Sequence, residues 1–337
     1  MKCKFEYVRY RRHFREPLQT AHGSWKVREA ILVRLTDPDG ACGFGEIAPI
    51  EAFGTESPDR AEASCRERRG CFDTAGLEEI PEDLPCCRFA LESAVAELSW
   101  SGEHDEVAPD DSLPVAGLLP AGGEAADRAR RLRKEGFGTL KWKIGVHPFF
   151  REREWFRRLR DEVPSGVRWR LDANGALDWR TAQEWGGELA GASVEFLEQP
   201  FPPSKIDDIL RLAGDFPVPL ALDESVGTLS SLRQWRDRGW PGLFVVKPAL
   251  AGSPERLAAF LRERGVKVVF SSALESAIGM KAALGVAFAG GHERRALGWG
   301  TGDLFGEDGL SPRWGSRVSR AEVETIKAGE TWKRLAG

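Results

Sequence analysis

Five ionisable residues recur at regular intervals between positions 143 and 247, each at the end of a short apolar run. They are spaced 24 to 29 residues apart: Lys143, Asp172, Glu198, Asp223 and Lys247. Carboxylates that gather in one place repel one another unless a cation neutralises them, and sites with oxygen ligands alone favour Mg²⁺. We therefore expect Asp172, Glu198 and Asp223 to bind Mg²⁺, for which Mn²⁺ can substitute, with a lysine on either side.

This combination of groups fits one type of reaction. A divalent cation that binds a substrate carboxylate also stabilises the negative charge that forms when the proton on the neighbouring carbon leaves. A lysine that has lost its own proton can then act as the base. The pattern predicts an enzyme that abstracts a proton α to the carboxylate of a small molecule.

Lys141 and Lys143 share one short run, Thr139 to Ile144. In a strand both lysines point to one face and Trp142 to the other. Mutual repulsion and burial would each lower a lysine pKa and so favour a base near neutral pH. Taken alone, the run also fits an exposed edge strand with two solvated lysines.

The elements around these residues predict a parallel barrel. From residue 113 onward, short apolar runs alternate with amphipathic helical segments, which is typical of a (β/α)8 barrel. We predict strands at 114–118, 139–144, 167–171, 194–197, 219–222, 243–246, 266–270 and 295–298, and helices at 124–135, 148–162, 179–190, 204–213, 229–238, 254–264 and 276–289. An open doubly wound sheet is the alternative, but no Gly-x-Gly-x-x-Gly follows the first strand. In a parallel barrel the strand ends share one rim, so the five ionisable residues would meet there.

The first hundred residues predict a smaller α+β domain that caps the barrel. A hairpin is expected from strands at 29–36 and 41–47 around Asp37-Pro38-Asp39-Gly40, with a third strand at 5–14 and helices from Ser57 and from Leu84. We place the cap at 1–104, the α/β barrel at 105–305, and a tail at 306–337 that returns to the cap. The polar loop at 16–25, which includes Thr20 and Gly23, is either an ordinary connection or a lid over the site.

Composition excludes several other classes of protein. The net charge is only −4 and arginines alternate with acids, so no nucleic-acid surface is expected. No apolar run is long enough to span a membrane. The six cysteines form no Cys-x-x-Cys pair and the charged start is unlike a secretory signal, which favours a reduced cytoplasmic protein. The oligomeric state stays open.

Each site residue also has a structural alternative. A single acid at a strand end often caps the next helix, as Asp223 could, and Ser271 and Ser272 could do the same. Arg170 is expected to pair with Asp172, its neighbour on the same face, and Asn174 to support the metal ligands. These alternatives do not explain why five ionisable residues recur in phase.

The motifs, in this order and spacing, resemble the muconate-lactonising-enzyme subgroup of the enolase superfamily: Lys141-Trp142-Lys143, Asp172-Ala173-Asn174, Glu198-Gln199-Pro200, Asp223-Glu224-Ser225 and Val246-Lys247-Pro248. Within the subgroup the chain looks most like the o-succinylbenzoate synthase family. That likeness covers nearly the whole chain and rests on the runs at 43–49, 270–279 and 300–305.

The resemblance implies a role for each residue. Lys143 would abstract the α-proton and then assist loss of hydroxide from the same face. Lys141 would keep Lys143 poised to act as a base. Lys247 would be a cation on the opposite face. The substrate's succinyl part would contact Ser271, Ser272 and Gly300. The reaction implied is dehydration of a cyclohexadiene carboxylate to 2-succinylbenzoate in menaquinone or phylloquinone biosynthesis.

Two other functions are weighed against this one. N-acylamino-acid racemases and dipeptide epimerases of the subgroup use the same two lysines, but they usually carry Asp-x-Asp at the eighth strand, where this chain has Gly298-Trp299-Gly300. Trp299 would either line the pocket or pack outside the barrel. A barrel that only binds a ligand is the third possibility, although buried acids without a role are costly.

Overall fold

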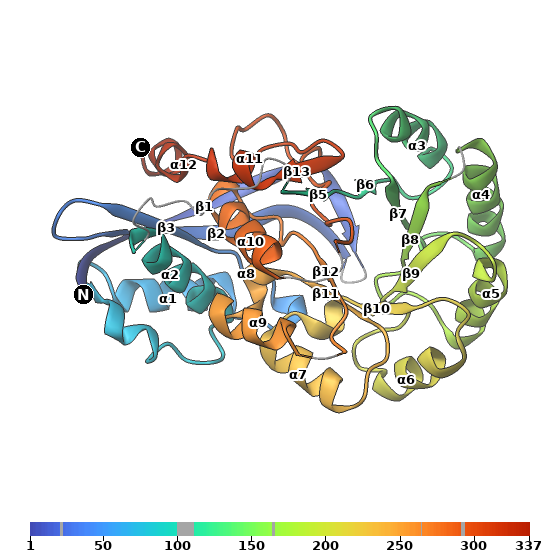
Figure 1. Ribbon diagram of the computed structural model, residues 1–337, viewed down its shortest axis with the longest axis horizontal. Helices are drawn as coiled ribbons and strands as arrows, with labels where there is room; N and C mark the ends of the chain where they lie inside the picture. Colours follow the sequence, from blue (N-terminus) through green and yellow to red (C-terminus); the bar gives the residue numbers. More distant parts are fainter. Residues whose placement is uncertain (21–22, 100–110, 164–165, 264, 291–293) are drawn as a thin grey trace.

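The computed structural model describes residues 1–20, 23–99, 111–163, 166–263, 265–290 and 294–337. An antiparallel sheet with two helices lies on one side, and a parallel barrel with its helices around the outside lies on the other (Figure 1). This confirms the predicted barrel with an α+β cap. The predicted domain boundary at 104–105 and residues 21–22 of the predicted lid lie outside the described residues.

The cap is a four-stranded sheet in the order β3-β2-β1-β4, with α1 and α2 packed on it. Its elements are β1 (Lys2–Thr20), β2 (Gly23–Thr36), β3 (Cys42–Ile47), η1 (Glu51–Phe53), α1 (Pro58–Glu67), β4 (Phe72–Asp73), η2 (Thr74–Leu77) and α2 (Pro85–Leu98). The Ser57 side chain caps α1, as its sequence predicts. Two glycines let β3 lie directly on α2, because a Cβ at Gly43 or Gly45 would collide with helix carbonyl oxygens.

The barrel sheet has seven parallel strands in the order β12-β11-β10-β9-β8-β7-β6. They are β6 (Gly117–Leu118), β7 (Thr139–Lys143), β8 (Arg168–Asp172), β9 (Val194–Glu198), β10 (Leu220–Leu222), β11 (Leu243–Val246) and β12 (Val268–Phe270). The barrel closes through single parallel bridges from Leu297 to Val115 and from Gly298 to Ser271. The predicted eighth strand is therefore two bridged residues rather than a full strand.

Helices surround this sheet on its outer side (Figure 1). They are α3 (Ala125–Lys134), α4 (Phe149–Glu162), α5 (Trp179–Leu189), α6 (Ile206–Asp215), α7 (Leu229–Asp237), α9 (Pro254–Leu261) and α10 (Ala277–Ala289). Two short elements, η3 (Glu224–Val226) and α8 (Pro248–Ala251), instead follow the ends of β10 and β11 and contact the cap. The short helix α8 was not predicted. Trp142 points outward from β7, is fully buried, and stacks on Phe156 of α4 at 6.0 Å, which confirms the predicted face of that strand.

The predicted strand at 114–118 was wrong in extent, because two different partners divide it. Ser112–Pro114 form β5, which pairs with β13 (Arg317–Ser319) of the tail, and only Gly117–Leu118 join the barrel sheet. After β13 come α11 (Arg320–Glu324) and α12 (Ala328–Ala336). The Trp332 ring of α12 lies 6.1 Å from that of Phe44 in the cap, whereas α11 packs on α10 of the barrel.

No helix among the described residues is long and apolar enough to cross a membrane.

Candidate active site

A cavity of about 950 Å³ lies between the cap and the rim formed by the carboxyl ends of the barrel strands. Most of the predicted site residues line it: Lys141, Lys143, Asp172, Asn174, Asp223, Lys247, Ser271, Ser272, Gly300 and Gly23. Glu198 and Arg170 are almost completely buried and do not reach its surface. Thr20 pairs with Gly23 at the end of the β1–β2 hairpin.

Strand register explains why these residues meet. Lys143 on β7 lies opposite Asp172 on β8, and Asp172 lies opposite Glu198 on β9. Glu198 in turn pairs with Ala221 on β10, two residues before Asp223. Because parallel strands in register end at one edge, residues far apart in the sequence become neighbours there.

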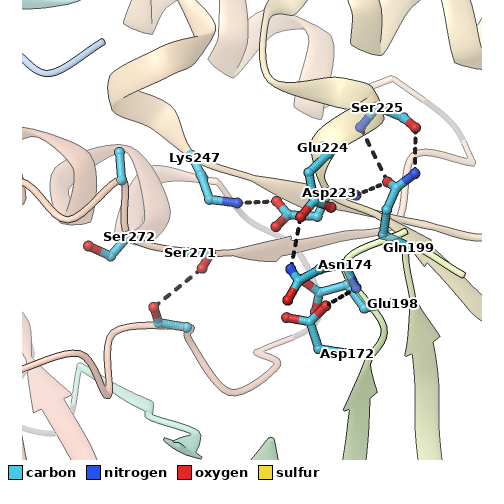
Figure 2. Close-up of polar contacts among 12 residues, drawn as sticks. Asp172, Asn174, Glu198, Gln199, Asp223, Glu224, Ser225, Lys247, Ser271 and Ser272 are labelled. Atoms are coloured by element: carbon cyan, nitrogen blue, oxygen red, sulfur yellow. Dashed lines mark hydrogen bonds and ion pairs between the residues drawn. The ribbon is translucent and has the colours of Figure 1, made fainter. Parts of the chain in front are cut away.

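The lysines contact the carboxylates directly. The Lys141 ammonium lies 2.9 Å from an Asp172 oxygen and 2.7 Å from a Glu198 oxygen. The Lys247 ammonium donates to Asp223, as Figure 2 shows. Among the described residues, no group of three acidic, His or Cys side chains is arranged to hold a metal ion. The acids are instead neutralised by ammonium groups.

Burial and neighbouring charges shift the pKa values of Glu198, Lys141 and Asp172. Burial, together with the charge of Asp172, raises the pKa of Glu198 to about 8. Burial alone would lower the pKa of Lys141, but the Asp172 and Glu198 carboxylates raise it above its ordinary value. Burial would likewise raise the pKa of Asp172, yet Lys141 holds it low. Three carboxylates gathered at one rim supply the oxygen ligands that a divalent cation prefers, so the donor set fits Mg²⁺.

Lys143 differs from Lys141 in its surroundings. Burial lowers the pKa of Lys143, the Asp172 carboxylate partly opposes this, and the positive charge of Lys141 lowers the pKa further. Its side chain faces the cavity. Of the two lysines on β7, Lys143 is therefore the one disposed to lose a proton.

Lys247 also contacts an aromatic ring from the cap. Its ammonium lies 4.3 Å from the centre of the Phe53 ring, a cation–π contact that the sequence did not indicate. Phe53 comes close because Gly227 has no side chain; a Cβ there would collide with the Phe53 carbonyl oxygen. The cap thus contributes directly to the environment of a site lysine.

Amide and acid side chains behind the rim organise the strand ends (Figure 2). The Gln199 carbonyl oxygen accepts from the backbone of Asp223 and Ser225, while its amide donates to Ser225 and to the Phe201 carbonyl. Sequence reasoning missed Gln199, although its place in Glu-Gln-Pro at a strand end was a signal for it.

Asn174 and Glu224 form a second pair at the rim. The Asn174 amide donates to Glu224 at 2.8 Å, and the Asn174 backbone N–H donates to Asp172 at 3.0 Å. Burial raises the pKa of Glu224 to about 7, with Asp223 and Asp172 adding to the effect. Asn174 therefore contacts a predicted metal ligand, whereas Glu224 was not singled out from the sequence.

The predicted ion pair between Arg170 and Asp172 was wrong. Arg170 pairs with Glu195 at 2.8 Å, donates to the Ala296 carbonyl, and stacks over the Phe196 ring. A register shift between β8 and β9 after Trp169 places Phe196, not Glu195, opposite Arg170. Glu195 nevertheless reaches the Arg170 guanidinium, and Asp172 pairs with Lys141 instead.

The loop after β12 is held by a buried acid that sequence reasoning missed. Glu275 accepts from the Ser272 hydroxyl, the Ala273 backbone and the Trp299 indole. Trp299 is thus buried behind the rim and does not line the cavity. Ser271 lines the cavity and donates to the Gly298 carbonyl at 3.3 Å.

The predicted loop at 16–25 was wrong in its secondary structure, because β1 and β2 extend through most of it. The two strands pair up to Thr20 and Gly23, with an irregularity between His13 and Leu18. Residues 15–18 and 23–25 line the cavity. The β1–β2 hairpin also contacts the segment that follows the eighth strand position, because the Phe14 ring of β1 stacks on the Phe305 ring at 4.7 Å.

Comparison with known proteins agrees with this architecture. Residues 124–313, more than half of the chain, match the family described as enolase C-terminal domain-like. The chain is 37% identical over 281 residues to an o-succinylbenzoate synthase of Thermosynechococcus vestitus, covering 82% of this chain and 85% of the relative.

Solved structures show the same relationship. An o-succinylbenzoate synthase from Thermosynechococcus elongatus BP-1, with Mg in its active site, matches with a TM-score of 0.85 and 33% identity over 98% of this chain and 100% of that chain. The L-Ala-D/L-Glu epimerase of Bacillus subtilis matches with a TM-score of 0.77 and 24% identity over 95% and 96%, which is a likeness of fold. The chain therefore belongs to the o-succinylbenzoate synthase family of the enolase superfamily.

Proposed function

We propose that the protein dehydrates 2-succinyl-6-hydroxy-2,4-cyclohexadiene-1-carboxylate to 2-succinylbenzoate, a step of menaquinone or phylloquinone biosynthesis. One observation carries this proposal: Lys143, whose pKa is lowered by burial, faces a cavity in register with the carboxylate of Asp172. The family relationship supplies the substrate class, and the site supplies a base and an acidic cluster.

Asp172, Glu198 and Asp223 would hold Mg²⁺, and Mn²⁺ would substitute for it. Once bound, the cation would supply positive charge to the substrate carboxylate and to the charge that develops when the α-proton leaves. Lys141 and Lys247 contact these carboxylates, so both ammonium groups lie beside the place where the cation would bind. The raised pKa of Glu198 indicates that a cation there would relieve electrostatic strain.

Lys143 performs both proton transfers. Its amine takes the proton from the ring carbon that bears the carboxylate. The electron pair of that C–H bond becomes the new ring double bond as the C–O bond of the neighbouring hydroxyl breaks, and the Lys143 ammonium returns the proton to the departing hydroxide. Water is released and the ring becomes aromatic, which supplies much of the driving force.

The remaining residues position the substrate and tune the base. Lys141 keeps a positive charge beside Lys143, and Lys247 presents a cation on the opposite side of the barrel mouth. Ser271, Ser272 and Gly300 form the wall that would receive the succinyl part, and the hairpin that carries Thr20 and Gly23 covers the cavity.

The racemase and epimerase alternative meets a steric obstacle at the eighth strand position. A Cβ at Gly298 would collide with Ser271, and a Cβ at Gly300 would collide with the Ala116 carbonyl oxygen. Neither position accommodates the aspartate that an Asp-x-Asp motif requires. The binding-only alternative offers no reason for a base beside buried acids.

The test follows ultraviolet absorbance of the cyclohexadiene substrate with and without Mg²⁺. Wild-type protein should consume it only with the metal, and Lys143→Ala should consume it about a thousandfold more slowly. Lys205→Ala is the matched control, because Lys205 is about half exposed on the surface and lies outside the cavity. Metal-independent consumption, no consumption by wild type, or full activity of Lys143→Ala would refute the proposal.

A further inference from the structure

Phe53 is the residue of the cap whose ring reaches a site lysine of the barrel. The centre of the ring lies 4.3 Å from the Lys247 ammonium. An ammonium at this distance is attracted by the negative face of the ring, and the attraction is stronger where water is excluded. Lys247 is only 9% exposed, so little water competes with the ring for its charge. The contact is therefore strong enough to fix where the ammonium lies.

The backbone holds both partners of this contact in place. In the turn η1, the Phe53 N–H donates to the Ile50 carbonyl at 2.9 Å, and Gly54 ends the turn with a φ of 80°. From the barrel, Gly227 packs against this turn, and a Cβ there would come within 2.6 Å of the Phe53 Cβ. The Lys247 carbonyl accepts from Leu250 at 2.9 Å, which fixes the start of α8. Ring and lysine thus meet between two ordered elements.

Lys247 has a second partner, and the two partners differ in how they would respond to a metal. The ammonium also donates to Asp223, one of the three acids proposed to hold Mg²⁺ (Figure 2). When Asp223 ligates a divalent cation, its negative charge is shared with that cation, which weakens its attraction for the ammonium. The Phe53 ring is uncharged and supplies no metal ligand, so its attraction for the ammonium is retained.

We infer that Phe53 is a positioning residue, which holds the Lys247 ammonium in place while the three acids bind the metal. The inference rests on the proposed function and extends it, because it gives the cap a part in arranging the charges of the site as well as in covering the cavity. Phe53 acts through Lys247, so its contribution should disappear when Lys247 is replaced.

The first test observes the contact directly, by NMR of the Mg²⁺-loaded protein labelled with ¹³C-lysine. The ε-methylene proton signal of Lys247, identified by its absence from Lys247→Met, should be shifted upfield by the ring above which the ammonium lies. Phe53→Leu keeps an apolar side chain but removes the ring, so the signal should return toward its ordinary position. Phe53→Tyr should preserve the shift. Leu18→Ala is the matched control, because Leu18 is another apolar residue of the cap that lines the cavity.

The second test is a double-mutant cycle on turnover of the cyclohexadiene. Phe53→Leu should lower kcat/KM about fivefold, the size expected for loss of a desolvated cation–π contact. In the Lys247→Met background the same substitution should change kcat/KM by less than twofold, since the residue through which Phe53 acts is gone. A ring that only supported the fold of the cap would cause the same loss in both backgrounds.

Two results would overturn the inference. One is a Lys247 signal of the Mg²⁺-loaded protein that Phe53→Leu does not move. The other is an equal loss of kcat/KM from Phe53→Leu with and without Lys247. Wild-type protein that shows the shifted Lys247 signal but does not consume the cyclohexadiene would instead refute the proposed function and leave the contact established.

Discussion

The affinity for Mg²⁺ should depend on pH through Glu198. In the metal-free protein burial and Asp172 raise the pKa of Glu198 to about 8, so at neutral pH this carboxyl holds a proton that a cation must displace. Well below pH 8 the dissociation constant should therefore rise about tenfold for each pH unit, and between pH 8 and pH 6 it should rise about fiftyfold. Lys141 keeps its proton throughout this range, because the Asp172 carboxylate holds the pKa of Lys141 above its ordinary value.

Isothermal titration calorimetry in buffers of different ionisation enthalpy measures both the dissociation constant for Mg²⁺ and the number of protons released on binding. We expect close to one proton released per Mg²⁺ at pH 7 and almost none above pH 9. Glu198→Gln should bind Mg²⁺ weakly and with a flatter pH dependence, whereas Glu154→Gln, an exposed acid on α4, should behave as wild type. A dissociation constant that stays within threefold from pH 6 to pH 9 would refute the electrostatic reasoning.

Three further outcomes are expected. Lys143→Ala should lower kcat by about a thousandfold, the contribution typical of a positioned base, while steady-state titration shows Mg²⁺ affinity within about threefold of wild type. Lys247→Met should reduce kcat/KM by roughly tenfold, since it removes a cation but not the base; complete loss of dehydration would instead indicate a second essential base. Glu152→Ala should destabilise the fold by about 3 kcal/mol in urea unfolding, because the buried carboxylate accepts three backbone N–H groups of the loop after Lys143, from Gly145 to His147. A loss below about 1 kcal/mol would show that water replaces those bonds.

The sequence alone determined the repeat of strands and helices and the position of the site residues within each repeat. Periodic apolar runs predict parallel strands and outer helices, because burial on one face selects residues at strand and helix spacing. The five ionisable residues could be placed at one rim because side chains at corresponding points of a repeat must meet at the same edge. The outward face of Trp142 followed from strand alternation alone.

Other features of the fold could not be predicted, because they depend on partners far apart in the chain. The eighth strand position is defined by bridges to Val115 and Ser271, not by its own composition. The 16–25 segment is polar, yet it extends the β1–β2 hairpin because each strand supplies the other's hydrogen bonds.

Tertiary structure also decided the partners of the charged side chains. Arg170 pairs with Glu195 on the neighbouring strand and not with Asp172, a choice of partner that no local pattern encodes. Lys141 and Lys143 share one short run of sequence, and only their different neighbours raise the pKa of Lys141 and lower that of Lys143. Pattern identifies which residues approach the rim, but the ionisation state of each is set by the distances and burial that folding imposes.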